Sequence, residues 1–295
     1  MPNAELLEAQ LKLCLDRLSN SEPVEIDDAW IEESGEMFKD CLRKQLAPRP
    51  KEDFRIRMSN LGKPTCQLQR EKEGAPKSRN EYNFIVKMML GDATECIMEV
   101  LLKAAGLNIT GGKEDVELKI NNHIIKGQDD IHIDGAVFDT KSCSPYAFNN
   151  KWRAGIDGLK KDDPFGYMKQ MVGYSDAQGK PAGGWVVVNK STGEVTIAGA
   201  EFSATDLAKQ RQEMCDVVDL IHSDKPFKKC FKEEIETTRG KKPTGSKKVP
   251  MNCTFCSYMK ECWPTAQFLP ATTTKAKNPK HYWYTEYGNN ATSTS

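Results

Sequence analysis

The sequence predicts an α/β fold in which helices flank a small mixed β-sheet, with an N-terminal helical extension. Three observations predict it. Residues 91–105 place their apolar side chains on one face of a helix. The Asp134-Gly135 dipeptide lies between two β-prone runs, which is typical of a two-residue hairpin turn. A second hairpin pattern at 184–198 precedes helical spacing over 203–222. Helices around a small sheet are the simplest fold for this order.

The N-terminal segment is expected to form two helices, at 3–20 and 26–46. Acidic residues open the second, which suits the positive end of a helix dipole. Pro48 and Pro50 interrupt the helical pattern, so we place the end of an N-terminal helical extension at residue 58.

The remaining elements lie within a core predicted at 59–264. Two short strands are expected at 116–120 and 123–127, ahead of the Asp134-Gly135 hairpin, and a helix at 164–177. Residues 265–295 are rich in Thr, Ser and Asn and lack periodicity, so we expect a flexible tail.

Composition limits the class of protein. The chain has 38% hydrophobic and 28% charged residues and a formal net charge of zero, as in a folded soluble domain rather than a nucleic-acid coat protein. No membrane-spanning run or secretory signal is recognised, so we expect a cytoplasmic protein, or one in the host cytoplasm if it is viral. The basic stretch 225–248 is either a phosphate-tracking segment or a solvated linker.

The hairpin places charged residues together. With Asp134-Gly135 as a two-residue loop, Asp130 lies opposite Asp139, with β-carbons about 4.5–5.5 Å apart. Strand alternation puts Lys141 on the same face as Asp139. Asp129 is the alternative to Asp130, and the register favours Asp130.

Two facing carboxylates repel each other unless a cation compensates them. Mg²⁺ prefers oxygen ligands and needs few carboxylates when water and phosphate complete its shell. Such a metal activates water and stabilises charge on a phosphoryl group. The alternative is a surface hairpin whose charges are merely solvated.

The motif Gly127-Gln128-Asp129-Asp130, followed by Asp139-Thr140-Lys141-Ser142, resembles the core signature of PD-(D/E)XK nucleases of the RecB-like branch. That resemblance implies a restriction-endonuclease-like core. The branch has an acidic ligand on the preceding helix, a position matched by Glu95. It also has a Q-x-x-x-Y motif, matched by Gln170 and Tyr174, whose spacing puts both side chains on one helical face. Asp139 departs from the more frequent Glu.

The resemblance implies a metal-dependent deoxyribonuclease, with an exonuclease expected over an endonuclease, acting in phage DNA recombination, repair or host-DNA degradation. Glu95, Asp130, Asp139 and the Thr140 carbonyl would bind Mg²⁺ or Mn²⁺. Lys141 would position or deprotonate water. The implied partners are DNA and a single-strand-binding or recombination protein. The 1–58 segment is matched only by a fainter similarity to nucleases of tailed phages.

Four of the ten cysteines suggest a metal centre. Cys253, Cys256 and Cys262 form a C-x2-C-x5-C pattern that suits zinc or iron–sulfur chemistry. Similarity to iron–sulfur members of the same branch, such as the AddB subunit and CRISPR-associated nucleases, implies a structural [4Fe–4S] cluster with Cys66 as the fourth ligand. The alternative function is a catalytically inactive iron–sulfur or zinc DNA-binding scaffold. We expect six others to be ordinary buried thiols: Cys14, Cys41, Cys96, Cys143, Cys215 and Cys230.

Overall fold

A computed structural model describes residues 2–48, 53–274 and 276–288. The chain divides into two compact units, both assembled from separate stretches of sequence. Unit 1 comprises Met1–Lys63 and Tyr82–His222, and unit 2 comprises Pro64–Glu81 and Ser223–Ser295. This division differs from the predicted boundaries at residues 58 and 264. An inserted stretch, 64–81, joins the C-terminal part of the chain in unit 2 because its helix packs against residues of 223–263.

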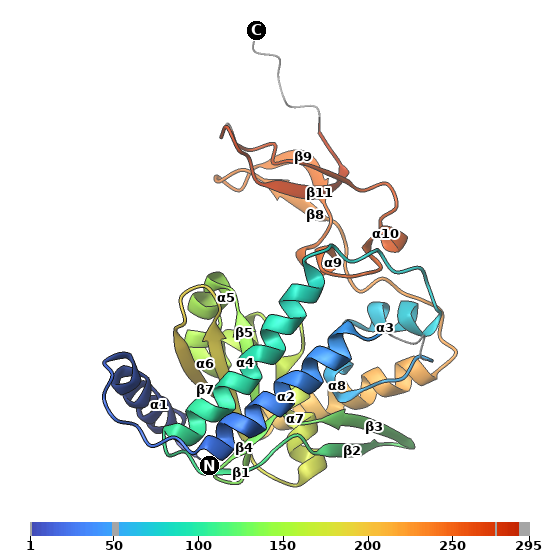
Figure 1. Cartoon of the computed structure of the whole chain (residues 1–295). Helices are drawn as coiled ribbons and strands as arrows, with labels where there is room; N and C mark the ends of the chain where they lie inside the picture. Colours follow the sequence, from blue (N-terminus) through green and yellow to red (C-terminus); the bar gives the residue numbers. More distant parts are fainter. Residues whose placement is uncertain (1, 49–52, 275, 289–295) are drawn as a thin grey trace. The chain divides into compact units, whose positions relative to one another are not determined.

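Unit 1 is built on a five-stranded mixed sheet in the order β1-β4-β5-β6-β7 (Figure 1). Its strands are β1 (Ile109–Gly111), β4 (Ile131–Ile133), β5 (Ala136–Cys143), β6 (Ala182–Asn189) and β7 (Val195–Gly199). The pair β5–β6 is parallel and the other pairs are antiparallel. The mixed α/β architecture is therefore confirmed.

The predicted hairpin is confirmed in its register. Ile133 pairs with Ala136 and Ile131 with Phe138, so the connection is the two-residue Asp134-Gly135 loop. Both loop residues have positive φ, 51° and 76°, as a type I′ turn requires. This register sets which side chains share a face with Asp139.

Helices enclose the sheet of unit 1, and a two-stranded ribbon lies beside it. The longer helices are α1 (Ala4–Ser19), α2 (Asp28–Leu46), α4 (Phe84–Ala104), α7 (Tyr167–Gln178) and α8 (Ala204–His222). The short ones are η1 (Met58–Asn60), α5 (Pro145–Asn150), η2 (Trp152–Ala154) and α6 (Gly155–Lys161). The ribbon consists of β2 (Asp115–Ile120) and β3 (His123–Gln128).

One apolar core joins α1 and α4 to the sheet. Leu11, Leu102, Ile133 and Phe138 are completely buried in it. Helix α7 contacts β5 and β6 and contributes no residue to this cluster, which places it on the other side of the sheet. Helix α2 runs alongside α4 (Figure 1). The two N-terminal helices thus belong to unit 1 rather than forming a separate extension.

Helix α4 begins at Phe84, earlier than the predicted start at residue 91. Gly91 lies inside the helix because packing outweighs the cost of about 1 kcal/mol for an interior glycine. The additional turns lengthen the element that carries Glu95.

Unit 2 contains a four-stranded antiparallel sheet and three short helices. The sheet has the order β10-β11-β9-β8. Its strands are β8 (Glu234–Thr237), β9 (Pro243–Lys248), β10 (Gln267–Pro270) and β11 (His281–Glu286). The helices are α3 (Thr65–Lys72), α9 (Met251–Thr254) and α10 (Met259–Cys262).

The prediction of a flexible tail at 265–295 is wrong for the segments that form β10 and β11. Phe268 pairs with Trp283 across these strands, and the Tyr284 side chain is buried. Aromatic side chains on these strands pair across the sheet and bury apolar surface, and this stabilises strands in a segment whose overall composition is polar. Residues 275 and 289–295 of that tail lie outside the described residues.

Within the part of the chain that the structure describes, none of the helices combines the length and the apolar character needed to cross a bilayer.

Candidate active site and cysteine pocket

Strand β5 carries the central pair of the candidate active site. It lies between β4 and β6, so its backbone is held on both sides. Asp139 is 3% exposed. Its Oδ1 accepts a hydrogen bond of 2.6 Å from Lys141 Nζ. The two residues are brought together because side chains two apart on a strand share a face.

Asp130 reaches the same place from the residue before β4. Its Oδ2 accepts a 3.0 Å hydrogen bond from the Thr140 backbone N–H and lies 4.0 Å from Lys141 Nζ. The Thr140 carbonyl accepts a 3.3 Å hydrogen bond from Lys141 Nζ. One ammonium thus faces two carboxylates and a carbonyl.

Asp129, the alternative to Asp130, belongs to a separate buried network. Its Oδ2 lies 2.7 Å from His132 Nε2 and accepts a 2.7 Å bond from Gln178, while its Oδ1 accepts a 2.9 Å bond from the Glu114 N–H. Both oxygens are therefore satisfied, and Asp129 anchors the chain so that Asp130 faces Lys141. His132 is completely buried.

Glu95 joins the cluster from α4. Its Oε2 lies 2.8 Å from Lys113 Nζ. Burial raises the pKa of Glu95, and the nearby charge of Asp130 raises it further. Asp130, from the residue before β4, therefore interacts with a carboxylate from α4 and with one from β5, namely Glu95 and Asp139.

Lys113 is a member of this site that the sequence analysis did not identify. Asp130 and Glu95 raise the pKa of the Lys113 ammonium to about 12, against the opposing effect of burial. The Gly111-Gly112 pair before it is a signal of a special turn, but it does not indicate where the lysine points.

Helix α7 supplies the predicted pair Gln170 and Tyr174. Their side chains hydrogen-bond to each other, and burial raises the pKa of Tyr174 to about 12, with Asp139 and Asp130 contributing in the same direction. Asp163 accepts 2.9 Å bonds from the N–H groups of Tyr167 and Met168 and so fixes the start of the helix.

Tyr167 is a second residue that the sequence analysis missed. Lys141 Nζ lies 5.9 Å from the centroid of its ring. Residues 167, 170 and 174 follow the three- and four-residue spacing of one helical face, and this pattern was available to find it. The Tyr167 ring therefore borders Lys141 on the side of α7.

The charged groups of the cluster shift one another's pKa values. Burial raises the pKa of Asp139 to about 8, and Asp130 adds to the effect, whereas Lys141 opposes it. The two aspartates in turn raise the pKa of Lys141. Although Asp139 Oδ2 lies 2.6 Å from Lys141 Nζ, it receives no hydrogen bond of acceptable geometry. A buried carboxylate oxygen with spare acceptor capacity fits a hard divalent cation.

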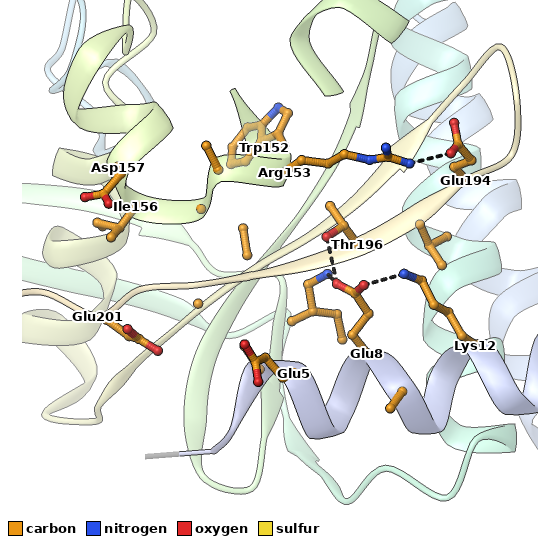
Figure 2. A pocket seen from close by; sticks show the side chains of 18 of the residues that line it. Glu5, Glu8, Lys12, Trp152, Arg153, Ile156, Asp157, Glu194, Thr196 and Glu201 are labelled. Carbon is orange, nitrogen blue, oxygen red and sulfur yellow. Dashed lines mark hydrogen bonds and ion pairs between the residues drawn. The ribbon is translucent and has the colours of Figure 1, made fainter. Parts of the chain in front are cut away.

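A larger cavity, of about 950 Å³, lies between α1, η2 and β7, away from this cluster (Figure 2). Two of the acidic residues that line it, Glu8 and Glu194, are already bonded. Glu8 Oε2 accepts 2.7 Å bonds from Thr196 Oγ1 and the Ile197 N–H, and Glu194 pairs with Arg153 at 2.6 Å. The cavity is large, but these partners leave its central carboxylates little unmet charge. The carboxylate cluster is the better candidate for chemistry.

The four predicted cluster cysteines share one small apolar pocket within unit 2. Cys66 comes from α3, and Cys253, Cys256 and Cys262 come from α9, α10 and the turn between them. The remaining lining is mainly apolar and aromatic and includes Phe231, Tyr258, Met259 and Trp263. Four thiols around one apolar pocket form a soft donor set that suits zinc or an iron–sulfur cluster.

Cys230 differs from the ordinary buried thiol that was predicted, because it is exposed. Its Sγ accepts a 3.1 Å bond from the Cys66 N–H and lies 3.3 Å from Thr65 Oγ1. These contacts at the start of α3, led by the Cys66 side chain, lower the pKa of Cys230 to about 6. Cys14, Cys96 and Cys143 are buried as predicted, whereas Cys41 and Cys215 are only half-buried.

None of the described His, Cys, Asp and Glu side chains forms a preorganised metal-binding group of three or more. The carboxylate cluster contains Lys141 and Lys113 between its acids, and the cysteines are grouped by a shared pocket.

Comparisons with known proteins do not identify a family. No family model and no curated protein matches the chain. A solved structure described as "Crystal structure of SSO0001" matches 76% of this chain and 93% of its own chain, with 15% identity and a TM-score of 0.41. The function therefore has to be argued from the site itself.

Proposed function

We propose that this protein is a metal-dependent DNA nuclease with a restriction-endonuclease-like core in unit 1. The observation that carries the proposal is the convergence of Glu95, Asp130 and Asp139 around Lys141. A structural ion pair needs one acid for each base. Here three acids face two lysines, Lys141 and Lys113, so the acids remain in excess, and a strongly perturbed group of this kind is typical of functional sites.

The residues present would hold Mg²⁺ or Mn²⁺ through Glu95, Asp130, Asp139 and the Thr140 carbonyl. When bound, such an ion lowers the pKa of water and stabilises charge on a phosphodiester. Lys141 holds the position from which a water molecule is oriented, since its ammonium already bonds to Asp139 and the Thr140 carbonyl.

Helix α7 supplies the residues that contact the substrate in this proposal. Gln170 and Tyr174 are hydrogen-bonded to each other, and Tyr174 interacts with both aspartates. We assign them to holding the DNA backbone or to organising Lys141. Gly127 allows the Tyr174 ring to pack closely against the backbone of β3, because a β-carbon at residue 127 would lie 2.9 Å from Tyr174 Cε1.

DNA cleavage with defined ends tests the proposal. Single- and double-stranded DNA, labelled at either the 5′ or the 3′ end, is incubated with and without Mg²⁺, and a closed circle serves as the end-free control. An exonuclease degrades the linear substrates and spares the circle. If neither Mg²⁺ nor Mn²⁺ supports cleavage of any substrate, the nuclease is refuted, and DNA binding without cleavage would then identify the inactive scaffold.

We further propose that Cys66, Cys253, Cys256 and Cys262 hold a structural [4Fe–4S] cluster, and zinc is the competing occupant. The support is their common apolar pocket in unit 2. Anaerobically purified protein should contain iron and acid-labile sulfide and absorb visible light. Cys262→Ser should lose both, whereas Cys215→Ser, a matched half-buried thiol in unit 1, should keep them. Stoichiometric zinc in a colourless protein would refute the cluster.

A role in phage DNA recombination, repair or host-DNA degradation remains part of the proposal. It includes a single-strand-binding or recombination protein as partner and a location in the cytoplasm, or host cytoplasm. These follow from the family resemblance of the motifs, and the cleavage polarity will show which role applies.

A further inference from the structure

Lys113 occupies a turn that is built to direct its side chain. Gly111, Gly112 and Lys113 have φ values of 157°, 139° and 57° in succession. Gly112 must be a glycine, because a β-carbon there would lie 2.6 Å from the Asp130 carbonyl oxygen. A lysine with positive φ is uncommon, and such backbone strain persists only where the surroundings impose it.

The surroundings do impose it. The Glu114 N–H donates a 2.9 Å bond to Asp129 Oδ1, and the Asp129 N–H donates a 3.2 Å bond back to the Glu114 carbonyl. Gln128 Nε2 lies 3.3 Å from the Lys113 carbonyl. The turn is therefore tied to the segment that presents Asp130, which fixes the backbone from which the Lys113 side chain extends.

Lys113 lies between the carboxylate cluster and a neighbouring cavity. It contacts Glu95 at 2.8 Å and interacts electrostatically with Asp130. Lys113 also borders a cavity of about 280 Å³, whose lining includes Asp130 and a Glu99 carboxylate that Lys103 compensates at 3.2 Å. The lysine can thus leave Glu95 without losing a polar environment.

We propose that Lys113 is a second functional lysine, which competes with a divalent cation for Glu95 and Asp130 and binds a DNA phosphate once the cation holds those carboxylates. Two cations cannot share one carboxylate oxygen at full strength, because like charges repel. Displaced into the adjacent cavity, the ammonium faces an anionic ligand instead. This inference rests on the proposed function and extends it to the substrate's backbone.

Metal binding without DNA gives the first test. Mn²⁺ affinity is measured by calorimetry on the full chain, for wild type, Lys113→Met and Lys113→Arg. We expect Lys113→Met to bind Mn²⁺ about tenfold more tightly, since the competing charge is gone, and Lys113→Arg to resemble wild type. Lys126→Met is the matched control, because Lys126 pairs with Glu117 on the ribbon at 2.6 Å. Unchanged Mn²⁺ affinity in Lys113→Met would overturn the competition.

DNA binding gives the second test. A Lys141→Ala background prevents cleavage, and binding of a single-stranded oligonucleotide is followed against salt concentration with Mn²⁺ present. Adding Lys113→Met should weaken binding and reduce the slope of the log–log salt plot by about 1, the loss expected for one phosphate contact. An unaltered slope would overturn the phosphate role.

These measurements separate the inference from the proposed function. A Lys113→Met effect on Mn²⁺ affinity, combined with no cleavage by wild type, would refute the nuclease and leave the competition standing. Cleavage by wild type with no Lys113→Met effect would refute only the role of Lys113. Wild-type protein that does not bind Mn²⁺ at all would refute both.

Discussion

Asp139 in unit 1 and Glu236 in unit 2 have the same small solvent exposure, 3% each, yet their pKa values shift in opposite directions. The pKa of Asp139 rises to about 8, whereas that of Glu236 falls below its usual value. Burial raises the pKa of both carboxyl groups. Asp139 is more densely enclosed by protein atoms than Glu236, so burial acts more strongly on it, and the groups around the two carboxylates also differ.

Glu236 is surrounded by neutral donors. Its Oε1 accepts a 2.5 Å bond from the Tyr284 hydroxyl, and its Oε2 accepts bonds from the hydroxyls of Thr244, at 3.0 Å, and Thr272. Asp139 instead depends on one lysine and faces another carboxylate. The hydroxyl donors around Glu236 satisfy its buried charge. Asp139 keeps negative charge that a bound ligand can neutralise.

Removing the lysine should have the largest effect. We expect Lys141→Ala to reduce Mg²⁺-dependent DNA cleavage by about 100-fold or more, since it removes the positioned cation of the site. Initial rates on end-labelled DNA measure this, with Lys126→Ala as a control for the loss of one positive charge. Wild-type rates in Lys141→Ala would place the chemistry elsewhere in the molecule.

Removing the satisfied carboxylate should chiefly cost stability. Glu236→Ala leaves buried hydroxyls without their acceptor, and we expect the free energy of unfolding to fall by about 2 kcal/mol. Urea unfolding followed by circular dichroism measures it. Glu286→Ala, which removes an exposed carboxylate that pairs with Lys247 at 2.7 Å, should cost less. Equal losses of unfolding free energy in the two variants would show that the buried hydrogen bonds of Glu236 do not stabilise the fold.

Removing the unsatisfied carboxylate should affect stability far less. We expect Asp139→Asn to change the free energy of unfolding by less than about 1 kcal/mol, because Asp130 still lies 4.0 Å from Lys141 Nζ and the repulsion between the two aspartates ends. The same urea titration applies, and cleavage should be lost. A destabilisation as large as that of Glu236→Ala would contradict the contrast between the two acids.

The pH dependence should show the smallest effect. Because the folded pKa of Glu236 lies below the ordinary 4.5, its contribution is complete above that value and is lost as pH falls through the folded pKa. Unfolding midpoints of wild type and Glu236→Gln, compared across acidic pH, should converge as pH falls. A constant gap between them would show that ionisation of Glu236 does not stabilise the fold.

Local patterns were sufficient for much of unit 1. The Asp134-Gly135 turn determines the register of β4 and β5, and strand periodicity then places Asp130, Asp139 and Lys141 together. Helical spacing pairs Gln170 with Tyr174. Lys113 and Tyr167 were missed because their approach depends on how a turn and a helix pack against the sheet. Cys230 was misjudged for the same reason, since its partner Cys66 is distant in sequence.

The sequence by itself determined the mixed α/β class, the hairpin register and the residues able to supply charge or thiols. These follow from periodicity and turn chemistry, which act over a few residues. Only the tertiary structure decided that Asp129 is satisfied by His132 and Gln178, that β10 and β11 complete a sheet, and that Lys113 reaches Glu95. Such outcomes depend on burial and on contacts between distant segments, for which short-range pattern carries no information.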